Sequence, residues 1–160
     1  MLALRFAAVL GLVFWVGGLA VLGIIGAPAL FDVIGASGPD GRALAGAAFG
    51  ETLARFQSAT YVCAAVILAS LTVRALLGPR PRYFLIRMLI AAAMTGTSLW
   101  SGFVLLPRMQ QAQRTLGPSS ASADANARRI EFNRLHAMST SLQLVPLLGG
   151  LVLIFFELKD

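Results

Sequence analysis

Residues 6–31 read FAAVLGLVFWVGGLAVLGIIGAPALF and contain no charged side chain. Three further stretches share this property, namely residues 56–73, 88–107 and 135–156. A helix rises about 1.5 Å per residue, so about 20 apolar residues cross the ~30 Å hydrocarbon layer of a membrane. Inside lipid each backbone donor and acceptor must find its partner within the segment, and a helix meets this condition. The sequence therefore predicts four transmembrane helices.

The composition of the 160-residue chain is typical of a membrane protein. Hydrophobic residues make up 58% and charged residues 12%, whereas soluble domains carry about 25% charge. The net charge of +6 does not predict nucleic-acid binding, because the arginines flank the apolar stretches and form no basic face with interleaved aromatic residues. Cys63 is the only cysteine, which excludes an internal disulfide. We expect the lipid bilayer, and no nucleic acid, as a partner.

The polar segments between the apolar stretches set the expected helix boundaries. We expect one membrane domain over residues 1–160, whose fold is an all-α, up-and-down bundle of four transmembrane helices. The expected helices cover residues 2–31, 42–77, 83–106 and 124–157. The second and fourth are longer than a membrane span requires, so both should extend beyond the membrane. Pro28 should bend the first helix near its end, and Pro107 should stop the third.

Charged residues in the connections predict the orientation of the helices. A compact turn at residues 78–82, Gly-Pro-Arg-Pro-Arg, is flanked by Arg74 and Arg87, and residues 117–120 form a flexible run. The amphipathic first turns of the fourth helix carry Arg128, Arg129, Glu131 and Arg134. With four crossings, both termini and the turn at 78–82 share one side. Because short arginine-rich loops stay in the cytoplasm, we expect both termini to be cytoplasmic.

Polar side chains within the apolar stretches gather in one half of the predicted bundle. Such side chains usually face the bundle interior or a cavity. On the fourth helix His136, Ser139 and Gln143 have the spacing i, i+3, i+7, which places them on one face as a polar stripe. Further polar residues expected at this end are Gln57, Tyr61, Ser98, Arg108 and Asp32. The other half of the bundle should be almost purely aliphatic.

Two interpretations of this polar cluster remain open. In the first, the side chains form hydrogen bonds between helices, which contribute about 0.6 kcal/mol each in bilayers. In the second, they line a small pocket in which His136 binds or relays a ligand, while Arg108 or Asp32 sets the local charge. Structural roles are expected for Trp15, Gly17, Gly18 and Pro28.

Catalytic and metal-binding patterns are weak in this sequence. One histidine and one cysteine cannot supply a tetrahedral zinc site within one chain. Haem would need His136 together with Met94, Met109 or Met138, and copper(I) could use His136 with a methionine. Ser139 lies one helical turn from His136 without an orienting carboxylate or an oxyanion hole in view. We therefore expect no enzyme, no catalytic residue, no metal and no cofactor.

Five short motifs resemble one known family. They are Trp15-x-Gly17-Gly18, Ala27-Pro28-Ala29-Leu30-Phe31, Ala45-Gly46 to Phe49, Leu106-Pro107-Arg108-Met109, and Phe132-x-x-Leu135-His136-x-x-Ser139-x-x-Leu142. Together they resemble the bacterial domain of unknown function 4149, which is similar to the eukaryotic transmembrane protein 205 and distantly to copper-resistance D-type membrane proteins. The resemblance implies a four-helix protein of the bacterial inner membrane without established enzymatic activity. Its implied pocket residues are His136 and Ser139, with Pro28 and Arg108 as neighbours.

Three kinds of function fit these expectations. The first is a small accessory subunit of a larger membrane complex or of a homo-oligomer, or a protein that handles a small molecule at the polar cluster. The second is a haem- or copper-binding membrane protein that uses His136. The third is an oligomeric transporter or channel, because one copy without acidic residues inside the membrane encloses little polar pathway.

Overall fold

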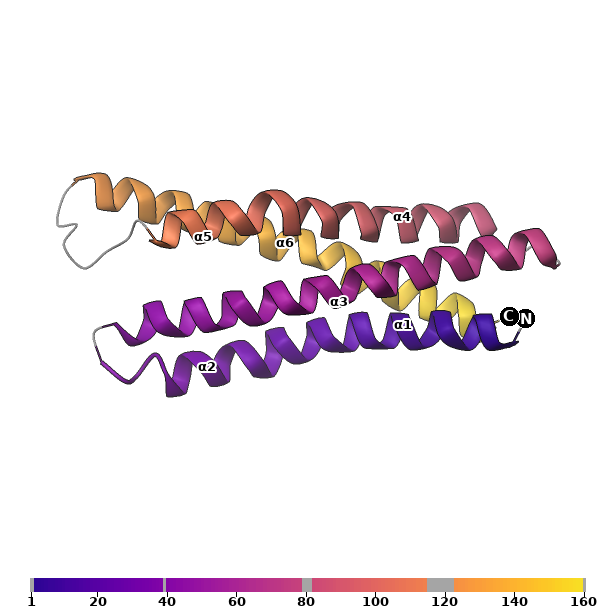
Figure 1. The fold of residues 1–160 in the computed structure, drawn as a ribbon, viewed down its shortest axis with the longest axis horizontal. Coiled ribbons are helices and arrows are strands. Elements are labelled where there is room, and N and C mark those ends of the chain that lie inside the picture. Colours follow the sequence, from indigo (N-terminus) through magenta and orange to yellow (C-terminus); the bar gives the residue numbers. More distant parts are fainter. Residues whose placement is uncertain (1, 39, 79–81, 115–122, 160) are drawn as a thin grey trace.

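The fold is an antiparallel bundle of four long helical segments (Figure 1). The computed structural model describes residues 2–38, 40–78, 82–114 and 123–159. The first segment runs through α1 (Leu2–Val21), η1 (Leu22–Gly26) and α2 (Ala27–Val33), and the second is α3 (Gly41–Leu77). The third consists of α4 (Phe84–Trp100), η2 (Ser101–Leu105) and α5 (Leu106–Arg114), and the fourth is α6 (Ala123–Lys159). The predicted all-α four-helix bundle is confirmed.

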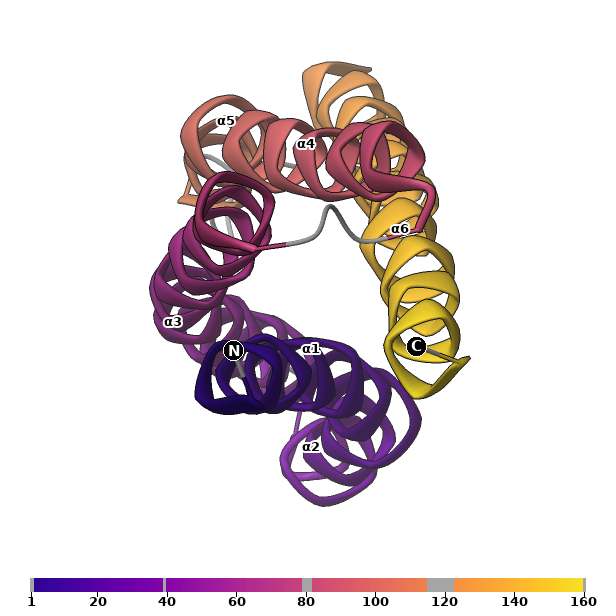
Figure 2. The same ribbon diagram turned by 90° about the vertical axis from the view of Figure 1, so that its right-hand side faces the viewer.

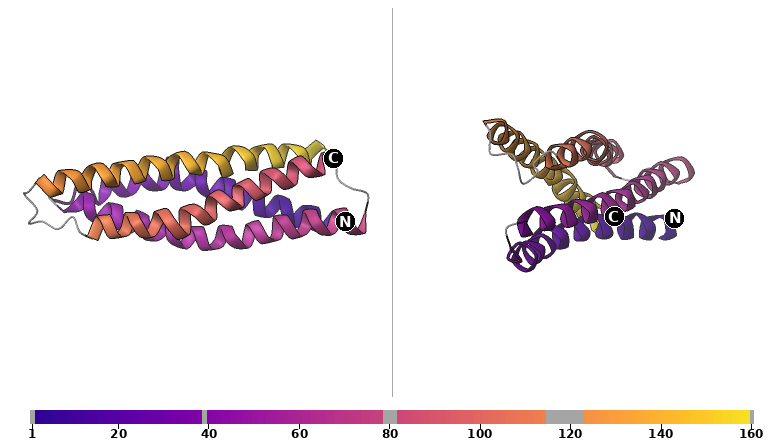
Figure 3. Two further views of the ribbon diagram at one scale, coloured as in Figure 1. Left: turned by 90° about the horizontal axis from the view of Figure 1, so that it is seen from above. Right: turned by 60° about the vertical axis from the view of Figure 1, so that its left-hand side comes forward.

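The four segments surround one core. Seen along the bundle, α1 packs against α3 and α6, and α4 packs against the same two helices (Figure 2). Both termini lie at the end where α3 stops and α4 begins, which we call the termini end (Figures 1 and 3). The opposite end, where α2 stops and α3 begins, is called the far end. The buried core consists of Leu12, Trp15, Ala64, Ile67, Leu71, Ala91, Met94 and Leu153.

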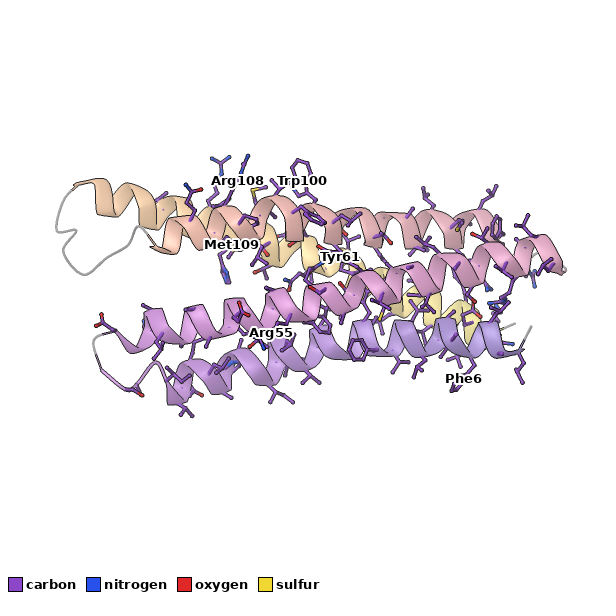
Figure 4. All side chains as sticks on the ribbon, viewed as in Figure 1. Phe6, Arg55, Tyr61, Trp100, Arg108 and Met109 are labelled. Carbon is purple, nitrogen blue, oxygen red and sulfur yellow. The ribbon has the colours of Figure 1, made fainter. Side chains whose placement is uncertain are left out.

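Each segment is long and apolar enough to cross a membrane. The candidate spans are Leu2–Val33, Gly41–Leu77, Phe84–Met109 and Arg134–Lys159. Large apolar side chains cover the outside of the bundle, and Figure 4 shows Phe6 and Trp100 pointing away from it. The 37 residues of α3 give a helix about 56 Å long, which exceeds the ~30 Å hydrocarbon layer. The chain is a four-span membrane protein.

A wide helical turn precedes Pro28 in the first segment and Pro107 in the third. The π-helical turn η1 ends two residues before Pro28, and η2 ends two residues before Pro107. Proline lacks an N–H and its ring collides with the carbonyl four residues earlier in a regular helix. A π turn widens the helix locally and relieves this conflict. The third helix therefore does not stop at Leu106 as expected, because α5 continues the helical path to Arg114.

Several sequence predictions concern parts of the chain outside the described residues. These parts are Pro79 to Pro81, the run at 117–120, and the side chains of Arg128, Arg129 and Glu131. Arg134 is described, belongs to α6 and is exposed. The flexible run and the amphipathic start of the fourth helix therefore stay predictions.

Gly150 allows α1 and α6 to approach each other closely. A Cβ atom at this buried position would overlap Cγ2 of Val16. We expect Gly150→Leu to lower the free energy of unfolding by about 1–3 kcal/mol, because overpacking displaces the neighbouring side chains. Gly96→Leu is the matched control, since no heavy atom lies within 4 Å of its Cβ position. Thermal unfolding in detergent, followed by circular dichroism, compares the two variants, and equal midpoints would contradict the close α1–α6 contact.

Candidate functional site

A pocket of about 240 Å³ lies at the far end of the bundle, with residues from all four helical segments around it. Its polar lining comes from α6, and its remaining lining, from α2, α3 and α5, is apolar. The lining residues are Ala27, Phe31, Gly46, Phe49, Gly50, Leu53, Leu106, Met109, His136, Ser139, Thr140 and Gln143. Among the described lining residues the hydrogen-bonding side chains thus all lie on one wall, which makes the pocket amphiphilic.

Helical spacing builds the polar wall. Three residues of α6 share one face with His136, because they follow it by three, four and seven positions: Ser139, Thr140 and Gln143. Ser139 is buried, Gln143 is half-buried and His136 is exposed. The Thr140 hydroxyl donates a hydrogen bond of 3.0 Å to the carbonyl of His136 within the helix. Imidazole, amide and hydroxyl groups each donate and accept hydrogen bonds. This wall can therefore bind either a donor or an acceptor group of a ligand.

The opposite walls are apolar and partly built of glycine. Phe31 comes from α2 and Phe49 from α3, while Met109 lies on the side of α5 that faces α3 (Figure 4). Gly46 and Gly50 present no side chain to the pocket, and no heavy atom lies within 4 Å of the Cβ position of Gly50. Because these glycines of α3 lack a side chain, part of the pocket volume lies directly beside the helix.

The two charged residues expected at the pocket do not line it. Arg108 and Asp32 are both exposed. Figure 4 shows Arg108 on the outer side of α5, away from α3. Pro28 is exposed as well, and it is its neighbour Ala27 that lines the pocket. The idea that Arg108 or Asp32 sets the charge inside the pocket therefore has no support in this geometry.

Three further predicted residues form a separate contact between helices. The side-chain amide of Gln57 donates a hydrogen bond of 3.0 Å to the carbonyl of Ser98, which joins α3 to α4. The ring of Tyr61 stacks on Phe103 of η2 with a centroid distance of 5.8 Å, and Ser98 is buried. Gln57, Tyr61 and Ser98 do not line the pocket. The hydrogen bond of Gln57 is of the interhelical kind that the first interpretation describes.

The residues with expected structural roles lie in different environments. Trp15 is 2% exposed and belongs to the core. Gly18 lies against the ring of Phe56, which a Cβ atom would overlap. Gly17 is exposed and no heavy atom lies within 4 Å of its Cβ position, so nothing in the structure explains a structural role for it.

A second polar site, which the sequence pattern did not predict, lies at the termini end. The carboxylate of Glu157, 3% exposed, lies 2.9 Å from Nη1 of Arg74 and 3.1 Å from Nη1 of Arg87. Nε of Arg5 lies 3.5 Å from the same carboxylate. We call these four residues the ionic cluster. The expectation that this half of the bundle is almost purely aliphatic is wrong.

The ionic cluster also binds backbone carbonyls at the C-terminal end of α6. Arg5 donates a hydrogen bond to the carbonyl of Glu157, and Arg87 donates one of 3.1 Å to the carbonyl of Phe156. Carbonyls in the last turn of a helix lack the usual donor four residues later, and cations near a helix C-terminus are favoured by its dipole. The cluster thus ties the end of α6 to α1, α3 and α4. The sequence contained one indication of this cluster. An acid follows the fourth apolar stretch, and an arginine flanks each of the other three stretches at the same end of the bundle.

The described residues offer few ligands to a metal ion. Among them, no group of three or more His, Cys, Asp or Glu side chains converges. Met109 and His136 do line the same pocket, and a thioether with an imidazole suits copper(I). Haem is a poor fit, because 240 Å³ is below the about 300–1,000 Å³ of pockets for drug-sized ligands, and haem is larger than those.

Comparison with known proteins identifies a family for this chain. No curated protein and no solved structure matches it. A family model described as "Domain of unknown function (DUF4149)" matches residues 10–117, more than half of the chain. The matched region contributes Phe31, Phe49 and Met109 to the pocket, whereas the polar wall on α6 lies outside it. The chain therefore belongs to the DUF4149 family.

Proposed function

We propose that this four-span membrane protein is not an enzyme and that it binds a small amphiphilic molecule in the far-end pocket. One observation supports this above others: four of the five motifs that carry the family resemblance contribute residues to the pocket. They supply Ala27 and Phe31, Gly46 and Phe49, Leu106 and Met109, and His136 and Ser139. These pairs come from four different helical segments, so a shared site explains their joint occurrence more directly than four separate packing roles.

The lining indicates the kind of molecule that would bind. Among the described lining residues the hydrogen-bonding side chains all belong to α6, so the ligand would carry a polar group at one side of an apolar body. The volume of 240 Å³ is below the about 300–1,000 Å³ of pockets for drug-sized ligands, so the ligand would be small. Among the described lining residues there is no Asp or Glu, the side chain that orients a histidine base beside a serine in hydrolases. This lining favours binding over catalysis.

Thiol labelling tests whether the pocket is open to small molecules. Ser139 and Ser98 are each 6% exposed, but only Ser139 lines the pocket. In a Cys63→Ala background, we expect Ser139→Cys to react with a small methanethiosulfonate reagent faster than Ser98→Cys. The expected ratio of the two labelling rates is about tenfold. It corresponds to a free energy of opening that is about 1.4 kcal/mol lower at Ser139→Cys than at Ser98→Cys. The reaction is measured by intact-protein mass spectrometry.

Equal labelling rates for the two thiols would contradict an open pocket and would leave only a packing role for the polar wall. Mass analysis of the protein isolated in mild detergent then identifies the bound molecule. The same isolation detects subunits that copurify, and these would support the role of an accessory subunit. A protein that carries neither a small molecule nor a subunit would contradict both forms of the proposal.

Copper(I) binding is the second candidate function. The observation that favours it is that Met109 and His136 line one pocket. The predicted distant similarity to copper-resistance D-type proteins stays a prediction, and so does the similarity to transmembrane protein 205. Metal analysis of the same isolated protein separates copper binding from binding of an organic molecule.

The proposed orientation places both termini in the cytoplasm of a bacterium, with the chain in the inner membrane. Arg5, Arg74, Arg82, Arg87 and Lys159 all lie at the termini end. Positive residues near the ends of membrane helices favour the cytoplasmic side. The far-end pocket would then open toward the periplasmic side.

A further inference from the structure

The ionic cluster contains more positive than negative charge. Three guanidinium groups, those of Arg5, Arg74 and Arg87, surround the one carboxylate of Glu157. The four described side chains of the cluster carry three positive charges and one negative charge. Charges removed from water are unfavourable unless opposite charges balance them. An additional anion would therefore be attracted to this cluster.

The members of the cluster differ in how accessible they are. The side chains of Arg87 and Glu157 are 1% and 3% exposed, so an incoming anion cannot reach them easily. Arg74 is 11% exposed and Arg5 is 32% exposed. Arg5 is also the member whose nitrogen lies farthest from the carboxylate, at 3.5 Å. An anion would thus approach Arg5 first, with Arg74 behind it.

The position of the cluster along the four helices suits contact with lipid headgroups. Arg5 belongs to the first turns of α1, Arg74 to the last turn of α3, Arg87 to the first turn of α4, and Glu157 to the last turn of α6. A helical turn rises about 5.4 Å, so the cluster lies close to the ends of all four spans. Basic residues at this level attract anionic lipids. The exposed side chains of Arg82 and Lys159 add positive charge at the same end.

We propose that the ionic cluster binds the phosphate of an anionic phospholipid, with Arg5 as the accessible donor. The lipid phosphate would accept hydrogen bonds from the guanidinium of Arg5, the most exposed member of the cluster. This site is separate from the far-end pocket, so the lipid proposal can be confirmed or contradicted independently of the proposed function.

Native mass spectrometry tests the proposal with the full chain in detergent. The protein is mixed with equal amounts of phosphatidylglycerol and phosphatidylcholine that carry identical acyl chains. We expect about fivefold greater retention of phosphatidylglycerol, the effect of one basic residue near a membrane surface. Arg5→Gln should abolish most of this preference. Arg55→Gln is the matched control, because Arg55 is an exposed arginine that pairs with Glu51 near the far end.

Three results would overturn the proposal. The first is equal retention of both lipids by the unmodified protein, a comparison that does not depend on the folding of a variant. The second is an Arg5→Gln variant that keeps the full preference. The third is an equal rise of the unfolding temperature with inorganic phosphate and with phosphatidylglycerol at equal phosphate concentration. Such a result would show that the site binds a free anion and not specifically a lipid.

Discussion

Glu157→Gln is expected to lower the free energy of unfolding by about 3–5 kcal/mol, the usual cost of removing one partner from a buried ion pair. The carboxylate of Glu157 accepts hydrogen bonds from Arg74 and from Arg87, which is itself 1% exposed. A neutral amide would keep the size of the side chain but remove its charge. The arginines would then remain close together without the carboxylate that they surround. Reversible unfolding in mixed micelles, followed by circular dichroism, measures the loss.

Glu51→Gln is the matched control for this prediction. Glu51 also accepts a hydrogen bond from an arginine, at 2.9 Å from Nε of Arg55. The two side chains are 59% and 80% exposed, however, and lie one turn apart on α3. An exposed pair of this kind contributes about 0–1 kcal/mol, so Glu51→Gln should change stability little. Losses of similar size in the two variants would show that burial does not strengthen the ionic cluster.

The fold was predictable because lipid leaves the backbone few choices. Each uncharged stretch, such as residues 88–107, must satisfy its own backbone groups, so helices follow from apolar length alone. Short polar connections then make neighbouring helices antiparallel. The four-helix bundle therefore followed from the sequence without any knowledge of side-chain packing.

The end of the third helix was harder to predict. Proline interrupts a regular α-helix, and on that basis Pro107 should have ended the segment. The π turn η2 changes the hydrogen-bond pattern before Pro107 and lets the helix continue through α5. The prediction assumed a regular α-helix, and for this reason it placed the end of the third helix too early.

The ionic cluster was missed because its contacts are not local. Glu157 follows Phe156 directly and looks like the polar boundary of an apolar stretch. Its partners Arg5, Arg74 and Arg87 are distant in sequence and belong to three other helices. Their meeting depends on how each helix is rotated about its axis. Apolar length does not fix that rotation.

The same limit applies to the polar cluster. Periodicity within one helix places His136, Ser139 and Gln143 on one face, and all three line the pocket. Depth alone was the argument for grouping Gln57, Tyr61 and Ser98 with them. Gln57 and Ser98 join α3 to α4 instead, and Tyr61 stacks on Phe103 of η2. Depth along a helix can be predicted from sequence, whereas the direction in which a side chain points requires the packing of its neighbours.

Filling the pocket from α3 should block access to it without damaging the bundle. Gly50 lines the pocket, and no heavy atom lies within 4 Å of its Cβ position. We expect Gly50→Leu to slow the thiol labelling of Ser139→Cys by about tenfold or more, a change of at least about 1.4 kcal/mol. The same substitution should remove any small molecule that copurifies with the protein. Mass spectrometry measures both effects.

Gly17→Leu separates this effect from a general change in the helices. Gly17 is also a helical glycine with no heavy atom within 4 Å of its Cβ position, but it is exposed and does not line the pocket. Both substitutions replace glycine with a better helix former, so both should raise helix stability by similar amounts. Labelling of Ser139→Cys should therefore be slow with Gly50→Leu and unchanged with Gly17→Leu. If both variants label at the rate of the parent, the space beside Gly50 is not the route to Ser139, and binding in this pocket is contradicted.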